Sequence, residues 1–313
     1  MRIVIVGSNG QVGSDLARVL RSSDVDFVSL SRSDLDVTEK LTLSEKLGKH
    51  NPDVIINCSV YHPVDECETH PDRSFAVNTI AVRDLALAAR DFHACLVHLS
   101  SDFVFDGEQG RPYCEEDTVR PLSVFGVSKV AGEQLLRAIL PNHFIIRTSG
   151  LYGLTGSRVK RGNFVETMLR LGKQSGEVRV VNDIRMAQTS TQNLAKQVLA
   201  LIRTKNYGTY HASDHGDYSW YEFAKKIFEY SGMSVAVKPV SWRDMPSVAP
   251  RPKYSVLENR RLKKLGLDQM QPIDAALQAY LKAREGSSLS ESSSQSGSLL
   301  GVRLSEVLND GCS

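Results

Sequence analysis

The feature that most constrains the fold is a short apolar strand that leads directly into a glycine-rich turn. Arg2 to Val6 has the continuous apolar pattern of a buried parallel strand, and Gly7-Ser-Asn-Gly10-Gln-Val-Gly13 follows at once. Glycines at GxxGxxG spacing before a helix, here expected over Ser14 to Leu20, allow backbone to approach a pyrophosphate closely. Such turns also occur where nothing binds. The strand–turn–helix context nevertheless predicts a dinucleotide site.

Strands and helices then alternate, which predicts an α/β fold with a Rossmann-type doubly wound parallel sheet. The expected strands lie at Asp26 to Leu30, Asp53 to Cys58, Cys95 to Leu99 and Phe144 to Thr148. The expected helices between them include Glu39 to His50 and Asp72 to Arg90. We expect a dinucleotide-binding domain over residues 1–152, to which elements at about 178–205 return, and a smaller mixed α/β substrate lobe over 153–285. The serine-rich tail, 286–313, is too poor in apolar residues to order itself.

Composition excludes several classes of partner. A formal net charge of +2 without a lysine or arginine run gives no indication of nucleic-acid binding. No apolar run approaches the ~20 residues of a membrane helix, so a cytoplasmic protein is expected. The five cysteines include no CxxC pair, which favours reduced thiols over a disulfide frame or a zinc site.

A second informative stretch follows the strand at Cys95 to Leu99. A polar turn, Ser100-Ser101-Asp102, would place Ser101 at the sheet edge where open α/β folds bind ligands. After Pro121 a helix carries Phe125 and Lys129 four residues apart, on one helical face. A serine, an aromatic residue and a lysine in this order are typical of short-chain dehydrogenases/reductases. The aromatic residue should be tyrosine, and here it is phenylalanine.

The end of the second strand bears on the choice of cofactor. An NAD site usually has an acidic residue there, whereas an arginine can accept the 2′-phosphate of NADP. No acid stands between Ser29 and Arg32, so NADP(H) is preferred and NAD(H) stays an alternative. Arg32 could equally be a solvated turn residue, and Asp34 lies nearby. A basic loop with Arg158, Lys160 and Arg161 is either solvated or a diphosphate clamp.

Several motifs in order resemble the dTDP-4-dehydrorhamnose reductases, a family of extended short-chain dehydrogenases. The turn from Gly7 to Gly13 is similar to the family's GxxGQLG, and Asn57 to Glu68 is similar to its N-x-A-A-Y-T-x-V-D-x-A-E loop. Ser100-Ser-Asp-Phe-Val-Phe-Asp-Gly107 resembles STDYVFDG. Counterparts of Arg147 to Gly153, Asn163 to Arg170 and Arg251-Pro252 also occur in the family.

This resemblance implies NAD(P)H-dependent reduction of a 4-keto deoxysugar nucleotide in dTDP-L-rhamnose synthesis. It implies that Ser101 polarises the carbonyl and that Lys129 binds the nicotinamide ribose. The implied cofactor-binding residues are Gly7, Asn9, Gly10, Gln11, Val12, Gly13, Ser31, Arg32, Asp36, Val37, Cys58, Ser59, Tyr61, Asn78, Ser100 and Lys129. The implied substrate-binding residues are Val64, Asp102, Phe103, Gly150, Asn163 and Arg251.

The residues that depart from the family pattern are those that the resemblance places at the reacting groups. Phe125 replaces the proton-donating tyrosine, Phe103 replaces a second tyrosine, and Gly150 stands where many members have tryptophan. Losing a general acid typically costs about 10²–10⁴-fold in rate. His62 is a candidate surrogate donor because histidine titrates near neutral pH, although a lone loop histidine is more often a surface residue.

Two functions therefore follow from the sequence. The first is the reductase, acting slowly or with a substitute acid. The second is a non-catalytic nucleotide- or NADP-binding regulatory subunit, similar to that of methionine adenosyltransferase. A nucleotide sugar is the expected ligand, and the sequence leaves open whether the chain forms a homodimer or binds a regulatory partner. Asp15 and Gln192 stand at two positions where some family members bind a metal through glutamates, so no metal is predicted.

Overall fold

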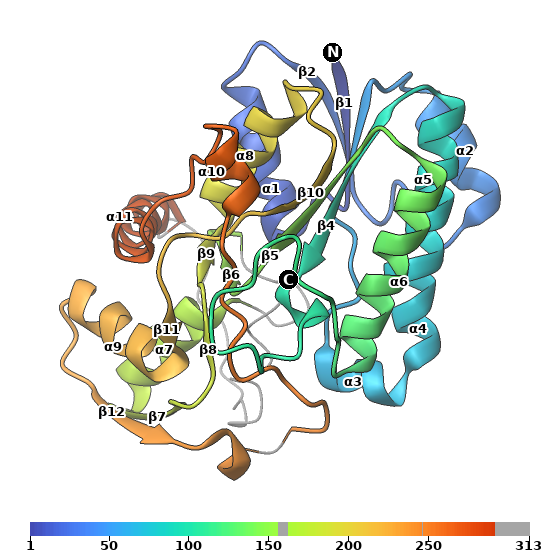
Figure 1. Cartoon of the computed structure of the whole chain (residues 1–313). Helices are drawn as coiled ribbons and strands as arrows, with labels where there is room; N and C mark the ends of the chain where they lie inside the picture. The colour runs from blue at the N-terminus through green and yellow to red at the C-terminus, as the bar shows by residue number, and fades with distance from the viewer. Residues whose placement is uncertain (156–161, 246, 292–313) are drawn as a thin grey trace.

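The computed structural model describes residues 1–155, 162–245 and 247–291, and its centre is one parallel sheet (Figure 1). The strand order is β10-β5-β4-β3-β1-β2, and every neighbouring pair is parallel. The strands are β1 (Arg2–Val6), β2 (Asp26–Leu30), β3 (Val54–Asn57), β4 (Cys95–Ser101), β5 (His143–Thr148) and β10 (Gly208–His211). The order reverses between β1 and β3, which is the switch point of a doubly wound sheet. The predicted fold class is confirmed.

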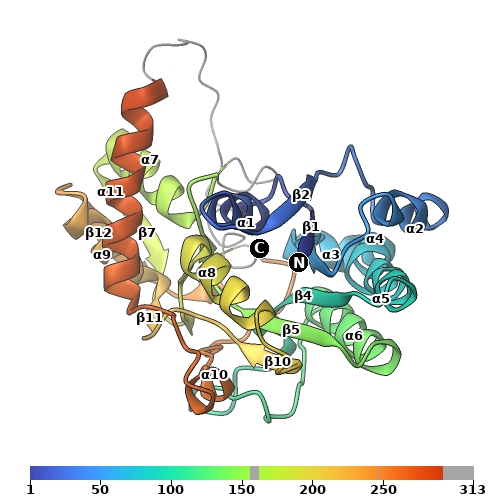
Figure 2. The same cartoon turned by 90° about the horizontal axis from the view of Figure 1, so that it is seen from above.

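Helices cover both faces of this sheet (Figure 2). On one face lie α1 (Gln11–Arg21) and α8 (Thr191–Ile202), and on the other lie α2 (Lys40–Gly48), α5 (Ala81–Asp91) and α6 (Val124–Ile139). Alternate residues of a strand point to opposite faces, so Ile3 packs in the apolar cluster beneath α1 and α8, and Val4 packs in the cluster beneath α2, α5 and α6. Both faces are buried, which explains why the strands read as continuous apolar runs.

A second, smaller lobe has its own apolar core, which includes Phe164, Trp220 and Phe223. Its main elements are α7 (Phe164–Ser175), β7 (Glu177–Val181), α9 (Trp220–Tyr230), β12 (Ala236–Val240) and α11 (Ile273–Glu291). The short remaining elements are α3 (Val64–Thr69), α4 (Pro71–Phe75), the π-helix η1 (Ala76–Ile80), η2 (Asp102–Val104), β6 (Leu151–Tyr152), β8 (Arg185–Met186), β9 (Thr189–Ser190), β11 (Tyr218–Ser219), η3 (Trp242–Asp244) and α10 (Arg260–Lys264).

Several expected boundaries differ from the structure. The strand expected to end at Leu99 continues to Ser101, because Ser100 and Ser101 still pair with β5. The single helix expected over Asp72 to Arg90 is divided by the π-helical turn of η1. Helix α11 runs on to Glu291, past the expected start of the tail at residue 286, because each added residue of a docked helix gains a hydrogen bond.

The structure also shows which later elements return to the first domain. Within the range 178–205, α8 packs on α1, whereas β7 belongs to the second lobe. The sheet is completed by β10, which lies beyond that range. Residues 292–313 lie outside the described part of the chain. None of the described helices combines the length and the apolar character that crossing a bilayer requires.

Candidate active site

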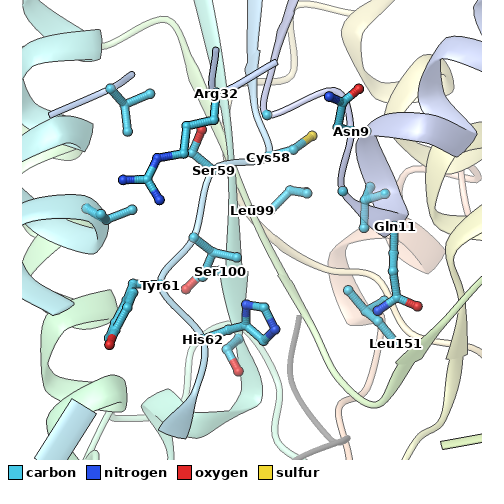
Figure 3. Close-up of a pocket in the computed structure, with 18 of the residues that line it drawn as sticks. Asn9, Gln11, Arg32, Cys58, Ser59, Tyr61, His62, Leu99, Ser100 and Leu151 are labelled. Carbon is cyan, nitrogen blue, oxygen red and sulfur yellow. The ribbon is translucent and has the colours of Figure 1, made fainter. Parts of the chain in front are cut away.

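A cavity of about 690 Å³ lies at the carboxyl ends of the central strands. Figure 3 shows Arg32 and Tyr61 on one side of it, Gln11 and Leu151 on the other, and Leu99 between them. Every predicted cofactor residue except Asn78 lines this cavity. Four further predicted site residues also line it, namely His62, Ser101, Phe125 and Gly150.

The glycine turn after β1 forms one wall. Gly7 has a φ of +78°, and the backbone N–H groups of Gly7 and Ser8 donate to the Leu30 carbonyl at 2.9 and 3.0 Å. A Cβ on Gly13 would lie 2.6 Å from the Gly7 carbonyl oxygen, so only glycine fits there. Helix α1 starts without a side-chain cap at Gly10, which leaves its first N–H groups at the cavity wall. This wall fits a diphosphate.

The residues after β2 form the next part of the wall. The Arg32 side chain is 88% exposed, and its Nε donates to Asp36 Oδ2 at 3.1 Å. Asp34 does not reach the cavity lining, because its carboxylate accepts from the backbone N–H and the hydroxyl of Ser31 at 2.9 and 2.6 Å. These two hydrogen bonds lower the pKa of Asp34. An accessible guanidinium beside an acid held in a turn fits a 2′-phosphate.

The loop after β3 is held from behind by Asn78. Its Nδ2 donates to the Tyr61 carbonyl and its Oδ1 accepts from the Tyr61 N–H, both at 2.9 Å. Asn78 is fully buried, so it is not the polar surface residue typical of such a helix, and it lies behind the cavity wall. The Tyr61 hydroxyl donates to Glu66 at 2.9 Å, and burial together with Glu66 raises the pKa of Tyr61.

Ser101 at the end of β4 and Phe125 and Lys129 on α6 line the same cavity. Lys129 is 1% exposed, and its Nζ donates to the Leu99 carbonyl at 2.6 Å. The Ser101 hydroxyl donates to Asp102 at 3.0 Å. Phe125 is 1% exposed and meets Phe103 edge to face, with ring centroids 5.6 Å apart. The rings of Phe103 and Phe125 thus lie together here, and neither carries an ionisable proton.

A buried ion network supports the same strand end. Ser100 donates to Glu133 at 2.6 Å, and Arg147 donates to both carboxylate oxygens at 2.9 and 2.7 Å. Burial raises the pKa of Glu133, but Arg147 and Arg137 outweigh it and lower that pKa to about 2. The network ties α6 to β4 and β5, and so fixes the helix that carries Lys129.

Five residues predicted to bind substrate do not line the cavity, and their substrate contacts stay predictions. Asn163 caps α7 and donates to the Gly153 carbonyl at 2.8 Å. Arg251 pairs with Asp65 at 3.2 Å, and Asp102 accepts from Ser255 at 2.5 Å. Val64 and Phe103 pack in one apolar cluster with Phe125.

Gly150 lines the cavity in a conformation that excludes a large side chain. Its φ is +54°, and a Cβ there would lie 3.0 Å from the Ala187 carbonyl oxygen and 3.0 Å from Gln188 Cα. Its own carbonyl accepts from the Thr189 N–H at 3.0 Å. The chain that follows β8 therefore lies directly against this position, and a tryptophan would require it to move.

Sequence reasoning missed part of the cavity wall. Leu99 lies near the end of β4, Thr148 ends β5 and Ser149 follows it, so the rule that ligands bind at strand ends could have identified all three. Ser33, Leu35, Val60, Val77 and Leu151 also line it, and only the tertiary fold brings them there. The basic residues Arg158, Lys160 and Arg161 lie outside the described residues.

The sheet order, the glycine turn and the residues at the end of β4 define a dinucleotide-binding oxidoreductase fold of the short-chain type. The family described as "RmlD substrate binding domain" matches residues 1–285. A dTDP-4-dehydrorhamnose reductase of Sinorhizobium fredii is 36% identical over 275 residues, covering 84% of this chain and 91% of the relative. The chain therefore belongs to the dTDP-4-dehydrorhamnose reductase (RmlD) family, as its motifs predicted.

Two solved structures agree with this assignment. That of a dTDP-4-dehydrorhamnose reductase from Clostridium acetobutylicum has a TM-score of 0.87 at 39% identity, and covers 91% of this chain and 100% of its own. The enzyme from Bacillus anthracis, solved in complex with NADP, has a TM-score of 0.86 at 37% identity, with 90% and 99% covered. The relatives are matched along nearly their whole length.

Proposed function

We propose that the chain reduces the ketone of a 4-keto deoxysugar nucleotide with NADPH, as dTDP-4-dehydrorhamnose reductases do. The observation that carries the proposal is the cavity in which the glycine turn meets Ser101 and Lys129. The name of the relative from Sinorhizobium fredii and the NADP bound to the Bacillus anthracis enzyme support the choice of substrate and cofactor. NAD(H) stays an alternative cofactor, and a homodimer or regulatory partner stays a prediction.

Each wall of the cavity has a part in this reaction. The Gly7–Gly13 turn and the start of α1 would hold the diphosphate, and Arg32 would hold the 2′-phosphate. When bound, the nicotinamide supplies a hydride. Ser101 would donate to the ketone oxygen, and Lys129 would hold the ribose hydroxyls. The buried Phe125 ring excludes water from the place where the oxygen becomes negative.

The test is NADPH oxidation with a dTDP-4-keto-6-deoxysugar. Measurable native turnover is expected, and Phe125→Tyr raises kcat by up to about 10²–10⁴-fold because it adds a general acid. Phe92→Tyr, which adds a phenol to a partly buried ring packed against Gly48, is the matched control and leaves kcat unchanged. The proposal fails if neither the native chain nor Phe125→Tyr oxidises NADPH while both bind it.

A second function, a non-catalytic binding subunit, is favoured by one observation. Phe125 and Phe103 fill the corner where the family has phenols, and both are almost fully buried. Such a chain would keep the dinucleotide and nucleotide-sugar sites while turnover is lost. Calorimetric binding of NADPH to a chain with no native turnover, and with turnover gained by Phe125→Tyr, is the result that supports this function.

A further inference from the structure

A short segment of the chain joins the second lobe to the first domain. It follows β12 and η3 and runs from the second lobe to α3 (Figure 1). We call residues 247–251 of this segment the strap. On the lobe side, Trp242 and Met245 pack against the core of the second lobe. On the other side, Ala249 packs in one apolar cluster with Phe125. The strap therefore spans the boundary between the two lobes.

A single carboxylate on α3 holds the strap. Asp65 Oδ1 accepts from the backbone N–H groups of Val248 and Ala249 at 3.2 and 2.9 Å. Arg251 donates to the two carboxylate oxygens at 3.3 and 3.2 Å, and the Ser247 hydroxyl lies 3.3 Å from Oδ1. Four of the five strap residues thus contact one side chain that lies 182 to 186 residues earlier in the sequence.

The charge of Asp65 strengthens these contacts. Burial raises the pKa of Asp65, but the Ala249 N–H and the Arg251 guanidinium outweigh it and hold that pKa below its ordinary value. The carboxylate is therefore ionised at neutral pH, and hydrogen bonds to an ionised acceptor are stronger than neutral ones. The side chains of Asp65 and Arg251 are 21% and 7% exposed, so water competes little for the pair.

The chain directly after the strap is also anchored by contacts that do not involve Asp65. A Cβ on Gly107 would lie 2.8 Å from Pro252 Cβ, so this chain lies directly on the loop after η2. The Ser255 hydroxyl donates to Asp102 at 2.5 Å. Because the chain on each side of the strap has its own anchor, the strap can detach from Asp65 without unfolding either lobe.

The strap borders the end of the cavity where the ketone would react. Ala249 is 3% exposed and packs with Phe125. Phe125 in turn lines the cavity together with Ser101 and Lys129. The wall that fits the diphosphate is made by a different part of the chain, the turn from Gly7 to Gly13. Detaching the strap would therefore change the sugar end of the cavity and leave the dinucleotide wall in place.

We infer that Asp65 is a positioning residue for the sugar nucleotide, because it holds the strap at the reacting end of the cavity and so closes the two lobes on this ligand. This inference rests on the proposed function. If the sugar nucleotide is held only when the strap is docked, its apparent affinity falls with the fraction of molecules that have a docked strap. NADPH binds along the other wall, so its affinity does not depend on docking.

The first experiment needs no turnover. Hydrogen exchange of the full chain follows the amides of Val248 and Ala249, which donate to Asp65 in the docked strap. Asp65→Ala should speed their exchange by about tenfold or more, because the charged acceptor is lost. In the native chain, a dTDP-4-keto-6-deoxysugar should slow this exchange, whereas NADPH alone should not. Asp65→Asn is the second variant if the first does not fold.

Asp117→Ala is the matched control. Asp117 also accepts from a backbone N–H, that of Cys114, at 2.8 Å, and from two nitrogens of Arg111 at 3.0 and 2.8 Å. These partners lie in the same loop as Asp117, so the variant removes a comparable carboxylate without touching the strap. It should leave exchange of the strap amides unchanged. Equal exchange in the native chain and in the Asp65 variant would overturn the inference.

The second experiment compares the two ligands by calorimetry and, where turnover is measurable, by steady-state kinetics. Asp65→Ala should raise the dissociation constant and KM of the dTDP-4-keto-6-deoxysugar by roughly 10- to 150-fold, the range for losing a hydrogen bond to a charged group. The NADPH dissociation constant and kcat at saturation should stay unchanged. Asp117→Ala should change none of these values. If Asp65→Ala weakened both ligands equally, or neither, its role would be purely structural and the inference would be overturned.

The outcomes separate this inference from the proposed function. Native turnover with an unchanged sugar-nucleotide affinity in Asp65→Ala overturns the role of the strap alone. Sugar-nucleotide binding that Asp65→Ala weakens, without turnover in the native chain or in Phe125→Tyr, supports the strap and overturns the reductase assignment. A native chain that does not bind the sugar nucleotide overturns both.

Discussion

The two walls of the cavity differ in what they retain of the family pattern. The wall made by Gly7 to Gly13 and Arg32 has the geometry that a dinucleotide requires. The opposite wall has the buried ring of Phe125 where the resemblance to the family implies a phenol, and the backbone at Gly150 is closed against a large side chain. Binding a diphosphate depends on many backbone groups, whereas donating a proton depends on one atom. A single substitution can therefore change the chemistry and leave recognition intact.

The largest expected effect comes from the ion network beneath both walls. Glu133→Gln should lower the free energy of unfolding by about 3–5 kcal/mol, because it leaves the buried Arg147 without its partner charge. Urea denaturation at neutral pH measures this change. Glu45→Gln on the exposed pair with Lys49 is the control, and should change stability by less than about 1 kcal/mol.

The same carboxylate gives a pH dependence with a definite sign. Its pKa is about 2 in the folded chain and near 4.5 when unfolded. The ionised Glu133 therefore stabilises the fold above about pH 4.5, and this contribution is lost as pH falls from 4.5 towards 2. In Glu133→Gln the loss of stability over that window should be shallower than in the native chain. If the free energy of unfolding depended on pH equally in both chains, the ionised Glu133 would not be stabilising the fold.

The next effect concerns the retained wall alone. Gly13→Ala sets a Cβ against the Gly7 carbonyl, so the turn must shift, at about 1–3 kcal/mol or roughly 5- to 150-fold in NADPH affinity. Fluorescence titration with NADPH measures this loss. Gly286→Ala, where a Cβ meets nothing within 4 Å, is the control. An unchanged NADPH affinity in Gly13→Ala would show that the diphosphate does not bind at this turn.

A smaller effect is expected at Arg32. Its guanidinium is mostly exposed, so Arg32→Ala should weaken NADPH by about 0.2–1 kcal/mol, or up to roughly fivefold, and leave NADH unaffected. The ratio of the two dissociation constants is the measurement. Arg90→Ala, on an exposed arginine paired with Asp91, should not change the ratio. An equal loss for both cofactors would show that Arg32 does not contact the 2′-phosphate.

The smallest effect is expected at His62, which lines the altered wall. If His62 is not the surrogate proton donor, His62→Ala should change kcat by less than about threefold, well short of the 10²–10⁴ that a general acid contributes. Steady-state NADPH oxidation measures it. Loss of turnover in His62→Ala would instead identify His62 as the surrogate donor.

The sequence predicted elements best where packing is local. β1 and β2 have the expected bounds, because each apolar run ends at clear turn residues. The π-helical turn at Ala76–Ile80 was not predicted; its Asn78 bonds to a loop 17 residues earlier, a contact that local patterns do not show. The extension of β4 through Ser101 was missed because its partner, Thr148, is remote in the sequence.

For the site, residue type and strand-end position were sufficient to predict that Ser101, Phe125 and Lys129 lie at one cavity. They could not show what Lys129 bonds to. His98 stands in the middle of an apolar strand, and nothing in its spacing indicates that its ring meets an amine 31 residues away. Hydrogen-bond partners across the sheet follow from tertiary register, which local patterns do not encode.

The position of β10 also constrains how the chain can be divided. This strand pairs with β5, so the sheet acquires its outer edge only after some sixty further residues have left the ribosome. A product truncated at residue 152 would expose the unpaired edge of β5 and the apolar face that α8 covers. Two separately expressed halves would therefore tend to aggregate, and the nucleotide-binding unit needs most of the polypeptide to fold.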